Sequence, residues 1–424
     1  MISRLLARSA VVRGIALAGV GLGVACGSEP ASPSADAIPT ARPQAQEILP
    51  ATAPKEADSD EPQDKAADVK RLETLGYISG VVDTETRSGV LLHDDTRAHP
   101  GLNFYNSRYD SGAQLIDMTG KVVHRWTGSG AAWQHAELLP TGEVLALEKD
   151  KRVVRVDRES NELWSYEALV HHDLSVGDDG RIYVLSRTKT LDRDLHPHGR
   201  LRGDEVIVLS PDGKLLSRVD VVAAMQRSPY EALLPLFDRR DGKKQDTWLL
   251  DPLHTNHIEV IGPGHPDPRF AADRVLLSMR NIDSVLVLDL VTGEIPWLIG
   301  PSFLKYQHHP VLLDSHRILV FDNGRKRSRV VEFDPVTREI HWAYAPKKGF
   351  FSRTRGSNQR LANGNTLITE SDKGYVLEVT PSGERVWVFA NPTFGDEGER
   401  SAIWRMTRFD PAALGFLTEA ATTP

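Results

Sequence analysis

Histidines recur at one position of a repeated pattern, at the start of the first strand-like segment of each repeat. They occur in WQHAELLP, HHDLSV, PLHTNHIEV and YQHHPVLL, as His135, His172, His254, His257, His308 and His309. Imidazole titrates near neutral pH and can act as a base, a nucleophile or a metal ligand. Because four repeats share the position, we expect these side chains to converge on one site rather than to serve packing alone.

Residues that could hold an anion lie close to these histidines in the sequence. They are Asn256 in PLHTNHIEV, Arg280 and Asn281 in SMRNIDS, Asn323 in FDNG and Arg329 in RKRSRVVEF. The planar guanidinium of arginine matches a phosphate-like or sulfate-like group. Three chemistries therefore fit: a metal site, a binding pocket, or group transfer through a phosphohistidine-like or sulfohistidine intermediate. The metal site is disfavoured, because Asp173 is the one carboxylate at the shared position.

The elements that must position these side chains form a repeat. Each copy pairs a strand and a tight turn with a second strand, which carries a tryptophan in five of six copies: Trp126, Trp164, Trp297, Trp342 and Trp387. A second hairpin precedes it in five copies. Two hairpins per unit of roughly 40 residues are typical of a propeller blade.

Six such units predict an all-β fold, a six-bladed β-propeller, in preference to two stacked sandwiches. The first unit is short, so we expect residues 401–410 to supply the strand that closes the ring. We expect the tryptophans to pack between blades and to take no part in chemistry. Residues 221–252 carry apolar side chains at helical spacing, which predicts a helical insertion between blades three and four, near the channel mouth.

Composition excludes several classes of protein. The 424 residues include 51 Lys and Arg against 58 Asp and Glu, a net charge of −7, and no basic stripe. This balance argues against a nucleic-acid partner. The one cysteine excludes an internal disulfide and a cysteine-based zinc cluster.

The N-terminus has the pattern of an export signal. Three arginines, Arg4, Arg8 and Arg13, precede an apolar run that ends in LGVAC at Cys26. We interpret residues 1–26 as a signal peptide in which Cys26 resembles the lipidated cysteine of a lipobox; ordinary cleavage beside a cysteine is the alternative. Residues 27–70 are rich in Pro, Ala and acidic residues, which predicts a disordered linker. We expect an exported protein, periplasmic or at the cell surface, with its propeller in residues 71–424 and membrane contact through a lipid anchor only.

Several strings of the sequence together resemble the bacterial arylsulfotransferase family. The similarity runs through LIDMTGKVVHRW, PLHTNHIEV, SMRNIDSVLVLDLVTGEIPWLIG, YQHHPVLL, SRVVEFDP and GSNQRLANGNTLITES. It implies a periplasmic six-bladed propeller that moves a sulfuryl group from a phenolic sulfate ester to a phenol. It also implies two small-molecule substrates, a sulfated histidine intermediate, and neither a nucleotide donor nor a cofactor.

The family motifs match particular residues of this sequence. The His-x-Asn motif matches His254 and Asn256, the Gln-His motif matches Gln307 and His308, and the arginine of the Ser-Arg strand matches Arg329. The resemblance implies catalytic roles for His254, His308 and Arg329. The remaining candidates are then substrate-binding residues: Asn256, His257, Arg280, Asn281, Gln307, His309, Asn323, His135 and His172.

The sequence departs from the family at one position. Where members carry the sulfated histidine on a late blade, this chain has Ser357 and Asn358, and no histidine follows His341. Either a histidine of another blade takes that role, or the chain is a propeller that binds an anionic or aromatic ligand without catalysis. A quinone-dependent propeller enzyme is the third alternative.

The lipobox interpretation makes a direct prediction. Replacing Cys26 with serine removes the thiol that would be acylated, so Cys26→Ser should move the protein from the membrane fraction to the soluble fraction. Fractionation followed by immunoblotting measures the change. An unchanged distribution would contradict lipidation at Cys26.

Overall fold

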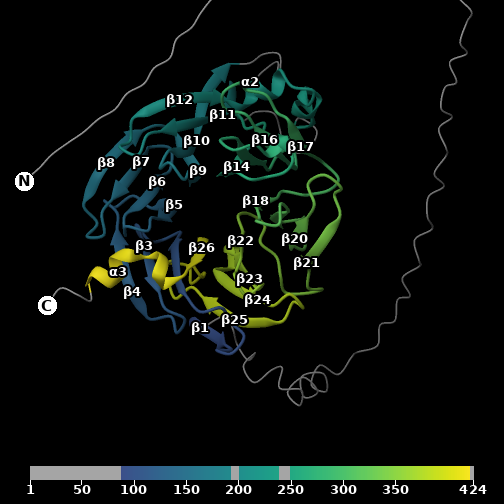
Figure 1. The fold of residues 1–424 in the computed structure, drawn as a ribbon. Coiled ribbons are helices and arrows are strands. Elements are labelled where there is room, and N and C mark those ends of the chain that lie inside the picture. Colours follow the sequence, from purple (N-terminus) through teal and green to yellow (C-terminus); the bar gives the residue numbers. More distant parts are fainter. Residues whose placement is uncertain (1–86, 192–199, 238–248, 421–424) are drawn as a thin grey trace, which may run out of the picture. The chain divides into compact units, whose positions relative to one another are not determined.

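The structure is a computed structural model that describes residues 87–191, 200–237 and 249–420. These residues form six antiparallel sheets arranged in a ring (Figure 1), which confirms the predicted six-bladed β-propeller. The predicted signal peptide (1–26), Cys26 and most of the predicted linker region lie outside the described residues, as does the start of the predicted propeller. Within the described ranges, no helix is both long and apolar enough to cross a membrane.

Each blade has four main strands, which follow one another from the channel outward. Blade one is β26 (Ile403–Phe409), β2 (Leu102–Ser107), β3 (Gly112–Ile116) and β4 (Val122–Thr127). Blade two is β5 (Trp133–Leu138), β6 (Val144–Glu148), β7 (Arg152–Val156) and β8 (Glu162–Glu167). Blade three is β9 (Val170–Val176), β10 (Ile182–Leu191), β11 (Arg200–Leu209) and β12 (Leu215–Asp220), with β13 (Leu249–Leu250) beside β11.

The other three blades follow the same order. Blade four is β14 (Thr255–Val260), β15 (Val275–Met279), β16 (Ser284–Leu288) and β17 (Trp297–Ile299). Blade five is β18 (His308–Leu312), β19 (Ile318–Asp322), β20 (Arg329–Phe333) and β21 (Ile340–Tyr344). Blade six is β22 (Ser357–Arg360), β23 (Thr366–Glu370), β24 (Tyr375–Val379) and β25 (Arg385–Ala390), with β1 (Gly89–His93) on its outer edge.

The core lies between neighbouring blades. The middle strands are apolar on both faces, as in β15 and β16, where every residue is buried. The outer strands face solvent: four of the six residues of β12 are exposed. This gradient follows from face-to-face packing, because the middle strands are covered on both sides by adjacent sheets.

Four of the repeated tryptophans join their blade to the next. The indole N–H of Trp126 donates to the carbonyl oxygen of Gly142 (3.0 Å), and that of Trp297 donates to Pro335 (2.9 Å). Trp342 and Trp387 make the same bond, to Pro381 and Met118 respectively. Each acceptor lies in a hairpin of the following blade. The tryptophans thus occupy the packing positions expected from the sequence.

The ring closes where the last inner strand, β26, pairs with β2 of blade one, as the sequence predicted. A buried ion pair reinforces this closure, since Arg408 of β26 contacts Glu378 of blade six. The Arg408 guanidinium also donates to Asn103 Oδ1 (2.8 Å) and to the His99 carbonyl oxygen (2.8 Å). The backbone N–H of Arg408 donates to Gln359 Oε1 (2.8 Å) on the neighbouring inner strand.

The predicted insertion begins with α2 (Val221–Gln226) and the 3-10 turn η1 (Glu231–Phe237). Asp220 caps α2 by accepting from the backbone N–H of Ala223 (2.9 Å). Val221 and Met225 are fully buried in the core between blades three and four. This part of the insertion is therefore a core element, and residues 238–248 lie outside the described residues. The other short helical turns are η2 (Pro268–Phe270), η3 (Ser371–Lys373), η4 (Pro411–Ala413) and α3 (Gly415–Ala420).

The closure pair allows a test of the ring. Glu378→Gln should lower the free energy of unfolding by about 3–5 kcal/mol, because it leaves the Arg408 charge buried without its counter-ion. Urea denaturation followed by tryptophan fluorescence measures the loss. Lys214→Ala, which breaks an exposed pair with Asp212, should leave the midpoint unchanged. Equal effects of the two substitutions would contradict a structural role for the buried pair.

Candidate active site

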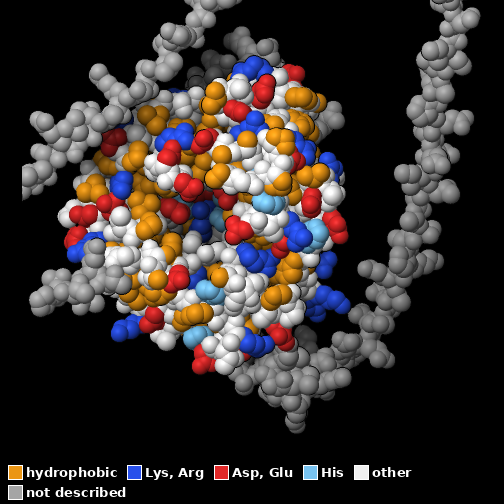
Figure 2. Space-filling model, in the orientation of Figure 1, with side chains coloured by type: hydrophobic (Ala, Val, Ile, Leu, Met, Phe, Trp, Pro, Cys, Tyr) orange, Lys and Arg blue, Asp and Glu red, His pale blue; other side chains and the backbone are white. Residues whose placement is uncertain are grey.

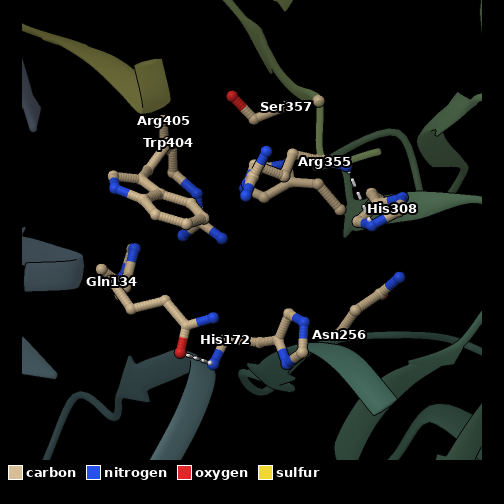
Figure 3. Close-up of a pocket in the computed structure, with 11 residues that line it drawn as sticks. Gln134, His172, Asn256, His308, Arg355, Ser357, Trp404 and Arg405 are labelled. Carbon is tan, nitrogen blue, oxygen red and sulfur yellow. Dashed lines mark hydrogen bonds between the residues drawn. The ribbon is translucent and has the colours of Figure 1, made fainter. Parts of the chain in front are cut away.

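The inner strands of all six blades begin around one small cavity, with a volume of about 40 Å³. Figure 3 shows side chains from different blades pointing into this shared space. The lining residues are Gln134, His135, His172, Asn256, His308, His309, Arg355, Gly356, Ser357, Trp404 and Arg405. We call this space the central pocket. Its lining holds four histidines and two arginines but no carboxylate.

Left-handed backbone brings several of these side chains to the axis. His172, His254, His309 and Arg355 all have φ between 50° and 58°, at or just before the start of an inner strand. The pairing of β9, β14 and β18 with the next strand shifts register near the same points. Such bulges redirect a side chain from the sheet face, and non-glycine residues in this conformation are strained.

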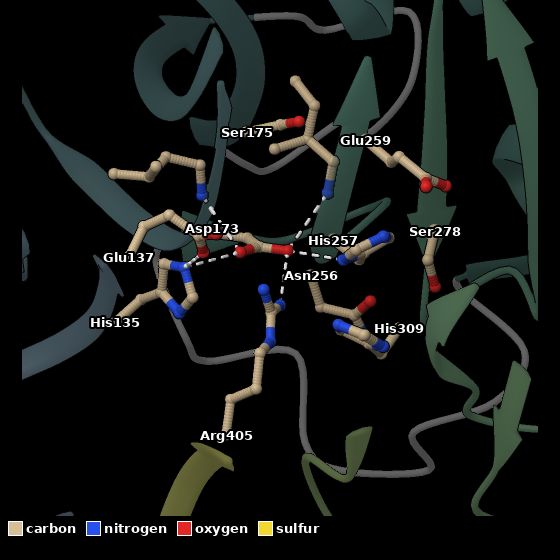
Figure 4. A network of polar contacts seen from close by, with 12 residues as sticks. His135, Glu137, Asp173, Ser175, Asn256, His257, Glu259, Ser278, His309 and Arg405 are labelled. Atoms are coloured by element: carbon tan, nitrogen blue, oxygen red, sulfur yellow. Dashed lines mark hydrogen bonds and ion pairs between the residues drawn. The ribbon is translucent and has the colours of Figure 1, made fainter. Parts of the chain in front are cut away.

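A buried carboxylate lies behind the lining of the central pocket, in contact with two lining residues, His135 and Arg405 (Figure 4). Asp173 has no exposed surface; its Oδ2 accepts hydrogen bonds from His257 Nδ1 (2.5 Å) and from the Arg405 guanidinium (2.8 Å). His135 Nε2 lies 3.3 Å from the other carboxylate oxygen. Burial by itself raises the pKa of Asp173, but Arg405, His135 and His257 outweigh it and hold the pKa well below its usual value. We call these four residues the Asp173 cluster.

His308 is fixed as a neutral imidazole. Its Nδ1 lies 2.8 Å from Asn323 Oδ1 and 3.0 Å from the Tyr306 carbonyl oxygen. Both partners accept hydrogen bonds, so Nδ1 carries the proton and Nε2 has a lone pair. That lone pair accepts from the backbone N–H of Arg355 (3.1 Å). Burial is the main cause that lowers the pKa of His308 to about 3, so the ring is uncharged at neutral pH.

His254 is paired with a carboxylate that sequence analysis did not single out. Its Nδ1 donates to Asp251 Oδ2 (2.6 Å), and its backbone N–H donates to Asp251 Oδ1 (3.0 Å). The ring of His254 packs edge-on against His172, with centroids 4.9 Å apart. Burial raises the pKa of Asp251, but the hydrogen bond from His254 and the nearby charges of His254, His171 and Arg187 together outweigh it, and the net shift is downward. The pair orients an imidazole beside the central pocket, as an acid–base dyad requires.

The other histidines close to the axis are also poor bases. Burial is the largest cause that lowers the pKa of His172, His257 and His309. For His257 the neighbouring Asp173 opposes this shift without reversing it. A set of neutral imidazoles can donate, accept or attack, but it brings no excess positive charge of its own.

Several predicted site residues lie outside the central pocket. Arg329 is on β20, the third strand of its blade, where it donates to Asp322 Oδ2 (2.8 Å) and to the Phe303 carbonyl oxygen (2.9 Å). The fully buried Gln307 amide donates to Ser278 Oγ (3.1 Å) and to backbone carbonyls of blade four. These two side chains support the blades beside the pocket and do not line it.

Most of the remaining predicted residues contact site residues without lining the central pocket themselves. The Asn281 side chain donates to the Asp251 carbonyl oxygen (2.7 Å), which supports the His254 dyad. The Arg280 guanidinium lies over the Tyr306 ring, 4.7 Å from its centroid. Asn323 holds His308, while Asn256 lines the central pocket directly and donates to the Gln307 carbonyl oxygen (2.9 Å).

Sequence analysis missed the two arginines of the pocket. Arg355 precedes the inner strand of blade six, and Arg405 lies on the inner strand of blade one. The Arg355 guanidinium stacks over Trp404, 4.1 Å from the ring centroid, and donates to Asp372 (3.1 Å). Extending the histidine register to the strings TRGSNQR and IWRMTRF would have found both. Among the described residues, no group of three or more His, Cys, Asp or Glu is placed to hold a metal ion.

The buried histidines predict a loss of stability in acid. Between the ordinary histidine pKa of about 6.5 and the lowered values, the unfolded chain binds protons that the folded chain does not. The contribution of these histidines to the free energy of unfolding is therefore fully present above about pH 6.5. It falls as the pH drops, by up to ~1.4 kcal/mol per pH unit for each histidine. Glu259 opposes this trend. Burial raises its pKa to about 8, so near neutral pH unfolding releases one proton from this group, and its contribution to stability grows as the pH falls.

Urea midpoints measured between pH 7 and pH 5 test this expectation. His172→Asn should make the profile shallower, because asparagine fits the left-handed backbone and removes one of the four shifted imidazoles. His316→Asn, in an exposed turn of similar φ, should leave the slope unchanged. A flat profile for the wild type would show that these imidazoles are not held neutral.

Comparisons with known proteins bear on the family and the fold. Residues 120–392, more than half of the chain, match the family described as arylsulfotransferase (ASST). Among functionally curated proteins none matches the sequence. A protein of unknown function from Bacteroides caccae is similar in structure, with a TM-score of 0.51 and 14% identity over 73% of this chain and 99% of that one. A streptogramin B lyase is similar at a TM-score of 0.44 and 10% identity over 78% of this chain and 95% of that one. The described blades and the family match agree, and the chain belongs to the arylsulfotransferase family.

Proposed function

We propose that the protein transfers a sulfuryl group from an aryl sulfate ester to a phenol, and that the central pocket holds this group. The observation that carries the proposal is the lining of the pocket, with two arginines, four histidines and no carboxylate. Such a lining offers guanidinium and imidazole donors with no competing carboxylate, which favours an oxyanion over a cation. Membership of the arylsulfotransferase family supports the same substrate class.

The pocket has donors and dimensions that suit a tetrahedral oxyanion. Ser357 Oγ and Trp404 Nε1 are buried donors that lack a hydrogen-bond partner among the described residues. Unpaired buried donors are costly, and an anion that accepts from them recovers that cost. A volume of about 40 Å³ holds on the order of three water molecules. That space suits the sulfuryl oxygens, and the aromatic ring of the substrate would lie toward the opening.

His308 is the nucleophile that the geometry supports best. His308 lines the pocket, its Nε2 lone pair accepts from the backbone N–H of Arg355, and its Nδ1–H is held by Asn323 and the Tyr306 carbonyl. Nε2 attacks the sulfur atom, an N–S bond forms, and the bond from sulfur to the aryl oxygen breaks. The two acceptors at Nδ1 stabilise the positive charge that develops on the ring. The Arg355 backbone N–H, released from Nε2 by this step, becomes available to a sulfuryl oxygen.

The dyad of His254 and Asp251 supplies the proton chemistry. In the first half-reaction His254 donates a proton to the departing phenolate, giving a free phenol. In the second half-reaction it takes the proton from the acceptor phenol, whose oxygen attacks sulfur while the N–S bond breaks. The products are a new aryl sulfate and the original neutral His308. Asp251 stabilises the charged imidazole of His254 before the first half-reaction and after the second.

A binding propeller without catalysis is the second candidate. One contact favours it: the Nε2 lone pair of His308 already accepts a hydrogen bond from the Arg355 backbone. The lack of the late-blade histidine at Ser357 favours it as well. In that case the central pocket would hold an aryl sulfate without cleaving it.

An assay with 4-nitrophenyl sulfate as donor and phenol as acceptor separates the two candidates. Nitrophenolate release should depend on phenol, and His308→Ala should lower kcat by about 10²–10⁴-fold, the scale of a lost catalytic group. Intact-mass measurement of the wild type mixed with donor alone should show a retained sulfuryl group that His308→Ala lacks. Binding of donor with no turnover would support the binding propeller instead.

The acid–base role of His254 predicts that the effect of its loss depends on the leaving group of the donor. His254→Ala should slow transfer from phenyl sulfate more than transfer from 4-nitrophenyl sulfate, because 4-nitrophenolate is stable enough to leave without a proton. The ratio of kcat/KM for the two donors measures this effect. His316→Asn is the control and should leave the ratio unchanged. An equal loss for both donors would remove the acid–base role from His254.

A further inference from the structure

A second and larger cavity lies at the other ends of the inner strands, with a volume of about 490 Å³. We call it the lower cavity. The residues around it come from the later positions of the strands whose first residues line the central pocket, such as Glu259 on β14 and Val311 on β18. Figure 2 shows how the ring is hollowed at its centre, where acidic, basic and histidine side chains gather on the face in view. The two cavities share His309 and Arg405, beside the Asp173 cluster.

Two polar side chains of the lower cavity, His257 and Asn358, present buried acceptors without a partner in the described part of the chain. His257 donates through Nδ1 to Asp173, so its Nε2 carries a lone pair, and this buried atom has no hydrogen-bond partner in the described part of the chain. Asn358 donates its amide N–H to the His309 carbonyl oxygen (3.0 Å), and its buried Oδ1 likewise lacks a described partner. Both residues line the cavity, and they are 4% and 3% exposed.

Two carboxyl groups line the same space. Glu137 lies on β5 with its side chain one-third exposed, and Glu259 lies on β14, where its Oε2 accepts from the Leu312 backbone N–H (2.8 Å). The two arginines of the cavity are already engaged by other carboxylates. Arg405 donates to Asp173 (2.8 Å), and Arg360 donates to Glu332 (2.6 Å). The space therefore offers carboxyl groups and lone pairs, while its guanidinium charges are balanced elsewhere.

The walls of the lower cavity are apolar. They include Leu138, Leu174, Ile258, Val311 and Met406. A ligand that filled this space would bury an aromatic or aliphatic body against these side chains and present its polar end to the acceptors. Ligand sites commonly combine apolar walls with a few polar groups that fix orientation.

We propose that the lower cavity binds an organic ammonium ion, a primary amine carried on a small apolar or aryl-alkyl body. An ammonium group has three donors and no acceptor, which complements the lone pairs of His257 and Asn358 and the carboxyl groups of Glu137 and Glu259. A neutral alcohol of the same shape has one donor and brings no charge to the carboxylate. This site lies outside the central pocket, with which it shares only the lining residues His309 and Arg405, and it does not depend on sulfuryl transfer.

Calorimetric titration of the full chain at pH 7 tests the proposal with two probes of equal shape. 2-Phenylethylamine, protonated at this pH, should bind, and 2-phenylethanol should bind at least tenfold more weakly. Glu137→Gln and Glu259→Gln should each weaken amine binding by about tenfold or more, the scale of a lost charged hydrogen bond. Glu167→Gln, at an exposed position on the outer strand β8, is the matched control and should bind the amine as the wild type does.

Proton release gives a second readout. Burial raises the pKa of Glu259 to about 8, so the carboxyl is largely protonated at pH 7 before the ligand binds. Asp173 also raises this pKa and Arg405 lowers it, while Glu137, His257 and His309 border the same space. An arriving ammonium ion favours the carboxylate, so binding should release a proton. Titrations in buffers of different ionisation enthalpy measure this release, which Glu259→Gln should abolish.

Three results would contradict the proposed amine site. Equal affinity for the amine and the alcohol, or unchanged amine binding in both glutamine variants while their thermal midpoints stay near that of the wild type, would overturn the proposal. So would an absence of amine binding by the wild type. His308→Ala should bind the amine normally, so a failure of sulfuryl transfer and a failure of this site are separable.

Discussion

The propeller is organised around one buried carboxylate. Asp173 carries a charge at the axis with no exposed surface, which is tolerable only where several donors compensate for the lost water. The compensating groups come from three other blades: Arg405 and His257 donate hydrogen bonds, and His135 Nε2 lies 3.3 Å from the carboxylate. The inner strands must therefore approach the axis at fixed heights and orientations. This constraint positions the first residues of those strands around one small space, and it divides the channel into two cavities.

The repeat allowed the fold to be predicted from the sequence, because turn residues, β-branched flanks and tryptophans recur at a fixed spacing. The histidine register also identified four side chains of the central pocket: His135, His172, His308 and His309. Arg329 shows where this reasoning fails. It matches a family motif, but it lies two strands out from the channel, and each strand adds about 4.8 Å. A motif match fixes position along the chain and carries no information on distance from the axis.

The sequence patterns did not identify the site residues that lie in loops. Asp251 reaches His254 from three positions earlier, in a segment whose path depends on the insertion before it. Arg355 lies ahead of its strand in a left-handed conformation that no propensity for arginine would suggest. The contacts of Arg355 with His308 and Trp404 come from how blades five, six and one meet, which is a tertiary property. Periodicity along the chain identifies blades, and contacts between blades decide which residues share a site.

The left-handed residues at the strand starts have a consequence for how such a site can change. His172, His254 and His309 occupy backbone geometry that asparagine, aspartate and histidine adopt several-fold more often than other non-glycine residues. These are also residue types that hydrogen-bond through short polar side chains. The backbone conformation thus restricts which residue types can occupy these positions, independently of any catalytic requirement. A propeller of this kind can move its reactive group among blades three to six with few substitutions, because each of these four blades already presents a left-handed position where histidine fits.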